Sequence, residues 1–217
     1  MDLTQFSPSS ALLTVVLLAL APFVAVMVTS FTKLVVVLSL LRNALGLQQV
    51  PPNVVLNGLA LVLSIYVMYP VGTDMGAKLQ GIDNIGGSTQ SMLKAADQAK
   101  EPLRDFLVKH SRPHERAFFM KTAQKSLKPE KAAKLTDRDF LVVVPAFTVS
   151  ELSVAFEIGF LIFLPFLVID LVISNILMAM GMMMLSPTTV SMPFKLLLFV
   201  LIDGWVKLTH GLILTYV

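Results

Sequence analysis

Charged residues are concentrated in one stretch of this 217-residue chain, and the rest is almost uncharged. Of the 17 lysines and arginines, 13 lie between Gly72 and Phe140, together with nine of the 14 acidic residues. Long apolar blocks flank this stretch, and only 14% of all residues are charged, against about a quarter in a typical soluble domain. This segregation predicts two membrane-associated apolar regions with a polar module between them.

The apolar regions divide into four hydrophobic segments: Leu12–Leu41, Val54–Val71, Phe140–Leu185 and Leu196–Val217. A helix needs about 20 apolar residues to cross a bilayer, so four segments predict about four spans. The third segment is too long for one crossing, and its Pro165 and Gly181 predict a bent or re-entrant hairpin. The fold class is therefore all-α, built of membrane-associated helical hairpins.

Three parts are expected along the chain. Residues 1–72 form an N-terminal hydrophobic hairpin, residues 73–139 a small polar helical module, and residues 140–217 the C-terminal hydrophobic hairpins. In the polar module, apolar side chains at helical spacing predict helices over Met92–Ala99, Pro102–His110 and Glu115–Leu127, after a flexible stretch over Gly81–Ser91. Its mixed charges are typical of a solvated surface.

Positive residues in short connections indicate which side faces the cytoplasm. We therefore place the hairpin residues Arg42, Asn43, Gln48, Gln49, Pro51 and Pro52 on the cytoplasmic side. With two spans before it, the polar module would then be extracytoplasmic. No residue before Lys33 is basic, which argues against a cleaved signal peptide and favours a retained first helix.

An enzyme, a metalloprotein and a nucleic-acid-binding protein are all disfavoured. The chain has no cysteine, which excludes disulfides and thiolate metal sites. His110 and His114 are four residues apart, but Pro113 interrupts their helix and no glutamate stands where a zinc hydrolase needs its base. No glycine loop that could bind phosphate is present. We expect no catalysis, no cofactor, no metal and no nucleic-acid partner.

Seven charged residues lie within or at the ends of the apolar segments. They are Lys33, Glu151, Glu157, Asp170, Lys195, Asp203 and Lys207. A charge at the bilayer centre costs roughly 2.5–3.5 kcal/mol, so such residues usually pair or face water. We expect structural pairing within the chain or between copies, and the candidate pairs are Lys33 with Asp170 and Asp203 with a neighbouring lysine. The alternatives are a proton relay through Glu157 and Asp170, or polar contacts that partner subunits supply.

Five of the seven residues from Met178 to Met184 are methionine. Successive residues of a helix are 100° apart, so Met178, Met180, Met182, Met183 and Met184 cannot share one helical face. Methionine is flexible and repacks around irregular shapes. The cluster is therefore typical either of a deformable seal around a conduit or of a gap-filler in a packed membrane core.

Several long motifs resemble the SctR/FliP family, and they occur in the same order. They are Val28–Lys33, Leu40–Asn53, Pro145–Leu152, Ala155–Phe160, Pro165–Asp170, Leu177–Pro187 and Pro193–Trp205. The resemblance covers nearly all of the chain outside residues 73–139. It implies a core subunit of the type III secretion export gate, in the bacterial inner membrane within the base of the secretion system.

The resemblance also implies partners and a mechanism. The family assembles as a pentamer with SctS-like and SctT-like subunits, alongside SctU-like and SctV-like proteins, and unfolded secreted proteins pass through the channel. Its hairpins are raised from the bilayer plane towards the periplasm while keeping contact with lipid, and its methionine-rich loop acts as a gasket. By this resemblance the five methionines lie at the constriction.

Two branches share the family, and the hairpin from Arg42 to Pro52 resembles the injectisome branch, which includes YscR and HrcR, more than the flagellar branch. The alternative is a secondary transporter with an intramembrane carboxylate relay. Such a protein would work alone in liposomes and would show internal repeat symmetry, which the apolar segments lack.

Overall fold

The computed structural model describes residues 8–80 and 97–217. Its helices are α1 (Pro8–Val28), α2 (Phe31–Ala44), α3 (Asn53–Gln80), α5 (Glu101–His110), α6 (Pro113–Ser126), α7 (Pro129–Ala132), α8 (Phe140–Ala179), α9 (Pro187–Leu201) and α10 (Gly204–Leu214). The described residues contain no strand, and the all-α prediction is confirmed.

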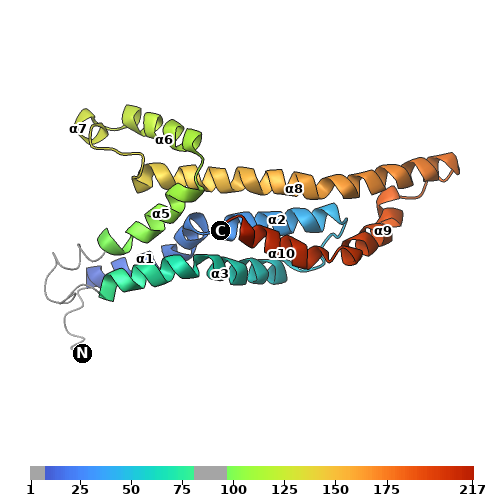
Figure 1. Ribbon diagram of the computed structural model, residues 1–217, viewed down its shortest axis with the longest axis horizontal. Coiled ribbons are helices and arrows are strands. Elements are labelled where there is room, and N and C mark those ends of the chain that lie inside the picture. Colours follow the sequence, from blue (N-terminus) through green and yellow to red (C-terminus); the bar gives the residue numbers. More distant parts are fainter. Residues whose placement is uncertain (1–7, 81–96) are drawn as a thin grey trace.

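The longest element is α8, a 40-residue helix that runs along one side of the whole molecule (Figure 1). It continues through Pro145 and Pro165. The chain reverses only at Gly181, which has a positive φ of 74°. The third segment was predicted to be a bent or re-entrant hairpin on account of Pro165 and Gly181. The helix is not interrupted at Pro165, and the chain turns only at Gly181, near the end of the segment.

Two of the described helices, α3 and α8, are each long and apolar enough to cross a membrane. Two further candidates are bent pairs: residues 22–28 of α1 with α2, at 79°, and α9 with α10, at 62°. Counting each pair as one span gives up to four. The last apolar segment is thus not a straight helix, because it breaks at Asp203, whose φ is 53°. Aspartate tolerates this left-handed conformation better than most residues do.

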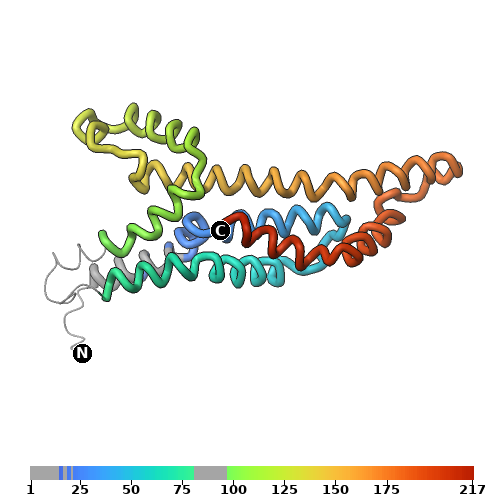
Figure 2. The backbone as a smooth tube through the Cα atoms, viewed as in Figure 1, coloured from blue at the N-terminus to red at the C-terminus, as the bar shows by residue number. Residues whose placement is uncertain are grey.

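Helix α2 forms the centre of the molecule and packs between α8 and α3 (Figure 2). Its buried side chains include Leu34, Val37, Leu38 and Leu41, which follow the i, i+3, i+4, i+7 spacing of a helix face. Leu56 and Ala60 of α3 complete the apolar contact on one side. Helix α2 is therefore buried within the protein, whereas many apolar side chains of α3 and α8 are exposed.

The described part of the polar module consists of α5, α6 and the short α7. The first two agree with the helices predicted over Pro102–His110 and Glu115–Leu127. Helix α7 lies in a stretch for which no helix was predicted. The expected flexible stretch at Gly81–Ser91 and most of the helix expected over Met92–Ala99 lie outside the described residues. Helix α3 extends eight residues past the expected boundary at residue 72, to Gln80.

Gly159 permits the close contact between α8 and α2. A Cβ atom there would lie 2.2 Å from Leu40 Cδ1 and 3.1 Å from Leu40 Cβ. We expect Gly159→Ala to destabilise the fold by about 1–3 kcal/mol through overpacking. Gly58→Ala is the matched control, because nothing lies within 4 Å of its added Cβ and helix propensity improves equally in both variants. In thermal unfolding measured in detergent, Gly159→Ala should have a lower Tm than the natural chain, and Gly58→Ala should not. Equal Tm values for the two variants would contradict the close contact.

Candidate functional site

The methionine cluster forms the tip of the hairpin between α8 and α9. The Met182 amide donates to the Leu177 carbonyl at 2.9 Å, and the Gly181 amide donates to the Met178 carbonyl at 3.0 Å. This pair of bonds is the Schellman motif, which needs a left-handed residue at its turn and explains why glycine stands at position 181. Helix α9 then begins at Pro187, a residue suited to the first turn of a helix.

All five methionines of the cluster are exposed to solvent in the single chain. Met183 is 83% exposed and Met184 fully so. The tip lies at the far end of α8, away from the polar module (Figure 1). Exposed methionine clusters are typical of surfaces that contact variable partners. The fold therefore brings Met178, Met180, Met182, Met183 and Met184 together without covering them.

An ion pair between a buried lysine and a partly exposed aspartate holds the base of this hairpin. Lys195 Nζ of α9 lies 2.6 Å from Asp170 Oδ2 of α8 and donates to the Ala44 carbonyl at 3.2 Å. Ser191 Oγ donates to the other oxygen of Asp170 at 2.5 Å. Because Ala44 ends α2, the lysine also places a positive charge at the negative end of that helix dipole. Three helices are thus tied together below the methionines.

A second ion pair, in which both side chains are buried, joins the N-terminal end of α2 to α8. Lys33 Nζ lies 3.3 Å from Glu151 Oε1, and both side chains are only 3% exposed. The expected pairing of Lys33 with Asp170 is therefore wrong. Asp170 lies 19 residues beyond Glu151 on the same helix, which separates them by about 28 Å along its axis. Lysine cannot span that distance.

The remaining intramembrane charges have different surroundings. Glu157 pairs with Arg112 of the polar module, Nη2 to Oε1 at 2.7 Å, and both side chains are partly exposed. Asp203 and Lys207 are exposed and form no ion pair among residues 8–80 and 97–217, so the predicted pairing of Asp203 with a lysine is not made within the described part of one chain. Thirteen residues of helix, about 20 Å, separate Glu157 from Asp170, so these carboxylates do not adjoin as a relay would require.

Hydrogen bonds from one arginine link the end of α2 to the start of α3 across the connection between them. Arg42 Nη1 donates to Asn53 Oδ1 at 2.6 Å and to the Pro51 carbonyl at 3.3 Å. Gln48, Gln49 and Pro52 line a small cavity beside it, and Asn43 lies in the last turn of α2. The sequence reasoning singled out this hairpin by its positive charge but missed Asn53 as the partner of Arg42. The sequence does contain a signal for this residue, because asparagine is favoured at the start of a helix and Asn53 begins α3.

The polar module docks on α8 through residues that the sequence reasoning did not assign. The Arg112 amide donates to Ser150 Oγ at 2.9 Å, next to the buried Glu151. On the other side of Glu151, the hydroxyl of Tyr216 donates to Oε2. Neither contact has a local sequence signal, because each joins segments at least 38 residues apart.

His110 and His114, the two histidines that are four residues apart, have different surroundings. No group of three possible ligands among the described residues could hold a metal. His114 instead lies 3.0 Å from Glu115, and the ring of His110 packs against Phe106 and Tyr216. His110 is thus placed in an apolar contact rather than towards a second ligand.

His110 gives the fold a dependence on pH. Burial, with smaller contributions from the charges of Lys33 and Lys109, lowers the pKa of His110 from 6.5 to about 4. Between these values the unfolded chain binds the proton and the folded chain does not, so stability falls as pH falls from about 6.5 to about 4. We expect this loss to be on the order of 2 kcal/mol after allowance for partial exposure.

The measurement for His110 is the Tm in detergent at pH 7.5 and at pH 4.5, compared between the natural chain and His110→Gln. The difference between the two pH values should be smaller in the variant, since its side chain does not titrate. His114→Gln is the control, because His114 is exposed. An equal pH dependence in all three proteins would contradict the assignment.

The sequence profile of the FliP family matches residues 12–212. The chain belongs to the FliP family. The resemblance noted in the sequence is thereby confirmed, and the matched residues include both ion pairs of α8 with lysines and the methionine tip.

The chain is similar to FliP-family proteins of both branches. It is 54% identical over 200 residues to the Yop proteins translocation protein R of Yersinia pestis, which covers 92% of each chain. It is 52% identical over 210 residues to the hypersensitivity response secretion protein HrcR of Ralstonia nicotianae, covering 96% of this chain and 97% of that protein. It is 42% identical over 205 residues to the flagellar biosynthetic protein FliP of Bacillus subtilis, covering 94% and 90%.

Proposed function

We propose that the chain is a core subunit of a type III protein secretion export gate, in which several copies surround the channel for unfolded substrate proteins. The observation that carries this proposal is the exposed methionine tip on a hairpin whose base is held by the ion pair between the buried Lys195 and Asp170. A rigid base with a soft tip suits a seal that must close around variable side chains. Family membership and the secretion names of the relatives support it.

In this mechanism the subunit contributes structure rather than chemistry, and the energy for transport comes from other components. The α8–α9 hairpin directs Met178, Met180, Met182, Met183 and Met184 into the channel. Flexible methionine side chains can pack together in the resting state and part around a passing chain without binding it tightly. Copies of the subunit would form a pentamer in the inner membrane with SctS-like and SctT-like subunits.

The injectisome branch is the better match of the two. The Yersinia and Ralstonia secretion relatives are 54% and 52% identical to the chain, against 42% for the flagellar relative from Bacillus. We propose that the polar module faces the periplasm, towards which the assembled hairpins are raised.

The native mass of the detergent-extracted protein tests this proposal. The chain is produced alone and then together with SctS-like and SctT-like partners from the same gene cluster. A discrete homo-oligomer that takes up these partners is expected, because the exposed apolar surfaces of α3 and α8 need cover. A stable monomer that ignores the partners would overturn it and favour a transporter that works alone.

A further inference from the structure

Tyr216, in the segment after α10, is a buried tyrosine with contacts on both of its sides. It is only 7% exposed. Its hydroxyl donates to Glu151 Oε2, and Lys33 Nζ lies 3.6 Å from the centre of its ring. A cation over an aromatic ring is attracted to it, most strongly when water is excluded. Tyr216 therefore contacts both members of the buried pair that joins α2 to α8: it donates a hydrogen bond to Glu151 and places its ring against Lys33.

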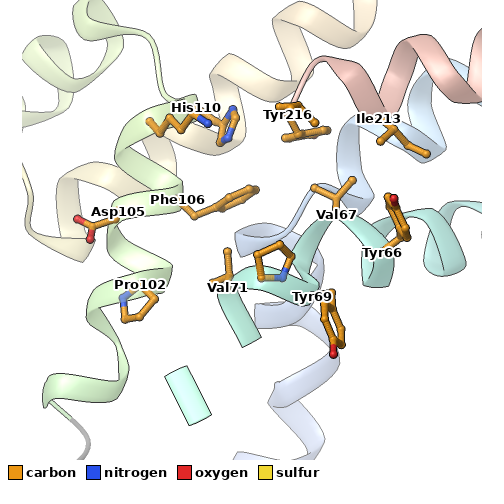
Figure 3. A pocket seen from close by; sticks show the side chains of 13 residues that line it. Tyr66, Val67, Tyr69, Val71, Pro102, Asp105, Phe106, His110, Ile213 and Tyr216 are labelled. Carbon is orange, nitrogen blue, oxygen red and sulfur yellow. The ribbon is translucent and has the colours of Figure 1, made fainter. Parts of the chain in front are cut away.

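The same ring contacts the polar module. Phe106 of α5 stacks on Tyr216 with ring centres 6.0 Å apart and an interplanar angle of 17°. His110 of α5 lies 5.0 Å from it in a tilted arrangement. Figure 3 shows Phe106 and His110 extending from α5 towards Tyr216. Four separate elements thus meet at one side chain: α2, α5, α8 and the segment after α10.

We propose that Tyr216 is a positioning residue that locks the polar module onto the membrane-spanning helices. The function of the module is then to cover the buried Lys33–Glu151 pair, with α5 as the cover and Tyr216 as its attachment. This inference goes beyond the export-gate proposal, since it concerns a contact within one chain.

Other contacts also hold the module: Phe106 and Leu107 of α5 lie in one buried apolar cluster with Val143 and Phe147 of α8, and the Arg112 amide donates to Ser150 Oγ. The ion pair between Arg112 and Glu157 is partly exposed, and exposed pairs contribute little to stability. On its α3 side, α5 borders a cavity of about 630 Å³, lined by Pro102, Asp105 and Phe106 opposite Tyr66 and Tyr69 (Figure 3). Tyr216 and His110 line the same cavity, so Tyr216 joins α5 to the other helices beside an incompletely packed region.

Because the chain has no natural cysteine, a single introduced cysteine can report on this contact. Leu103→Cys places one on α5, where the leucine is half-buried against the cluster that contains Phe106 and Tyr216. The rate at which a maleimide labels this cysteine in the intact membrane-embedded chain measures how often α5 lifts away.

We expect Tyr216→Phe to raise the labelling rate about tenfold, the effect of losing one hydrogen bond to a charged group. Tyr216→Leu also loses the stacking on Phe106 and should raise the rate further. The matched control is Tyr69→Phe with Tyr69→Leu, because Tyr69 lines the same cavity but its side chain is largely exposed. These controls should leave the rate unchanged.

Equal rates in the Tyr216 and Tyr69 variants would overturn the proposal. If Tyr216→Leu does not accumulate, the comparison of Tyr216→Phe with Tyr69→Phe decides alone, since both keep the ring. The export-gate proposal is tested by native mass and leakage, not by this labelling. Labelling can therefore contradict the role of Tyr216 while native mass and leakage support the export gate. The opposite combination of results can be recognised in the same way.

Discussion

Lys33→Met should destabilise the chain by about 3–5 kcal/mol, the cost of leaving one member of a buried ion pair without its partner. Both side chains of the Lys33–Glu151 pair are almost completely buried, so water cannot replace the lost ammonium group. The measurement is the unfolding transition in detergent. Lys207→Met is the matched control, because Lys207 is exposed and its loss should change stability by about 0.5 kcal/mol or less.

A second variant separates the ion pair from simple packing. In Lys33→Met/Glu151→Gln no charge is left buried at this site. The amide oxygen of the glutamine can still accept the hydrogen bond of Tyr216. Most of the lost stability should therefore return. If the double variant is as unstable as the single one, the loss came from the lysine stem and its contacts, and the charge argument is wrong.

Replacing Met182, Met183 and Met184 together with alanine should raise leakage of small solutes through the resting complex by on the order of tenfold, because an apolar constriction that has been widened no longer excludes water. Assembly should be unaffected, since none of the three side chains is buried in the subunit. Leakage is measured in cells or in liposomes that contain the assembled complex.

Replacing the same three methionines with leucine is the control for the alanine variant. Leucine conserves volume, so the resting seal should remain closed. Leucine is stiffer, and we expect secretion through this variant to slow while leakage stays low. Unchanged leakage in an assembled alanine variant would rule out the gasket role for these residues.

The sequence predicts most of the helices because their cause is local. Apolar blocks must be buried or placed in lipid, and the charged stretch must lie in water, which separates α3 and α8 from the polar module. The hairpin tip was also predictable, because Gly181 and the surrounding methionines lie close together in the chain. Of the two residues that predicted a bend or turn, Gly181 is at the turn and Pro165 is not, since the long helix α8 accommodates that proline.

The partners of the charged residues were not predictable. Lys33 has no local cue that distinguishes Glu151 from Asp170, and only the packing of α2 along α8 decides between them. The same holds for Arg112 with Glu157, which joins the polar module to a membrane-spanning helix. The break at Asp203, and the absence of an ion pair there within the described residues, also depend on the return path of α10.

Crosslinking to a stalled substrate tests most directly whether substrate passes the methionine tip. A single cysteine at position 183 is compared with one at position 54, where Val54 is equally exposed at the start of α3. The chain has no other cysteine, so any disulfide to a cysteine-bearing substrate reports the chosen site. We predict a disulfide from Met183→Cys and none from Val54→Cys. A substrate that crosslinks to position 54 or to neither position would contradict the account.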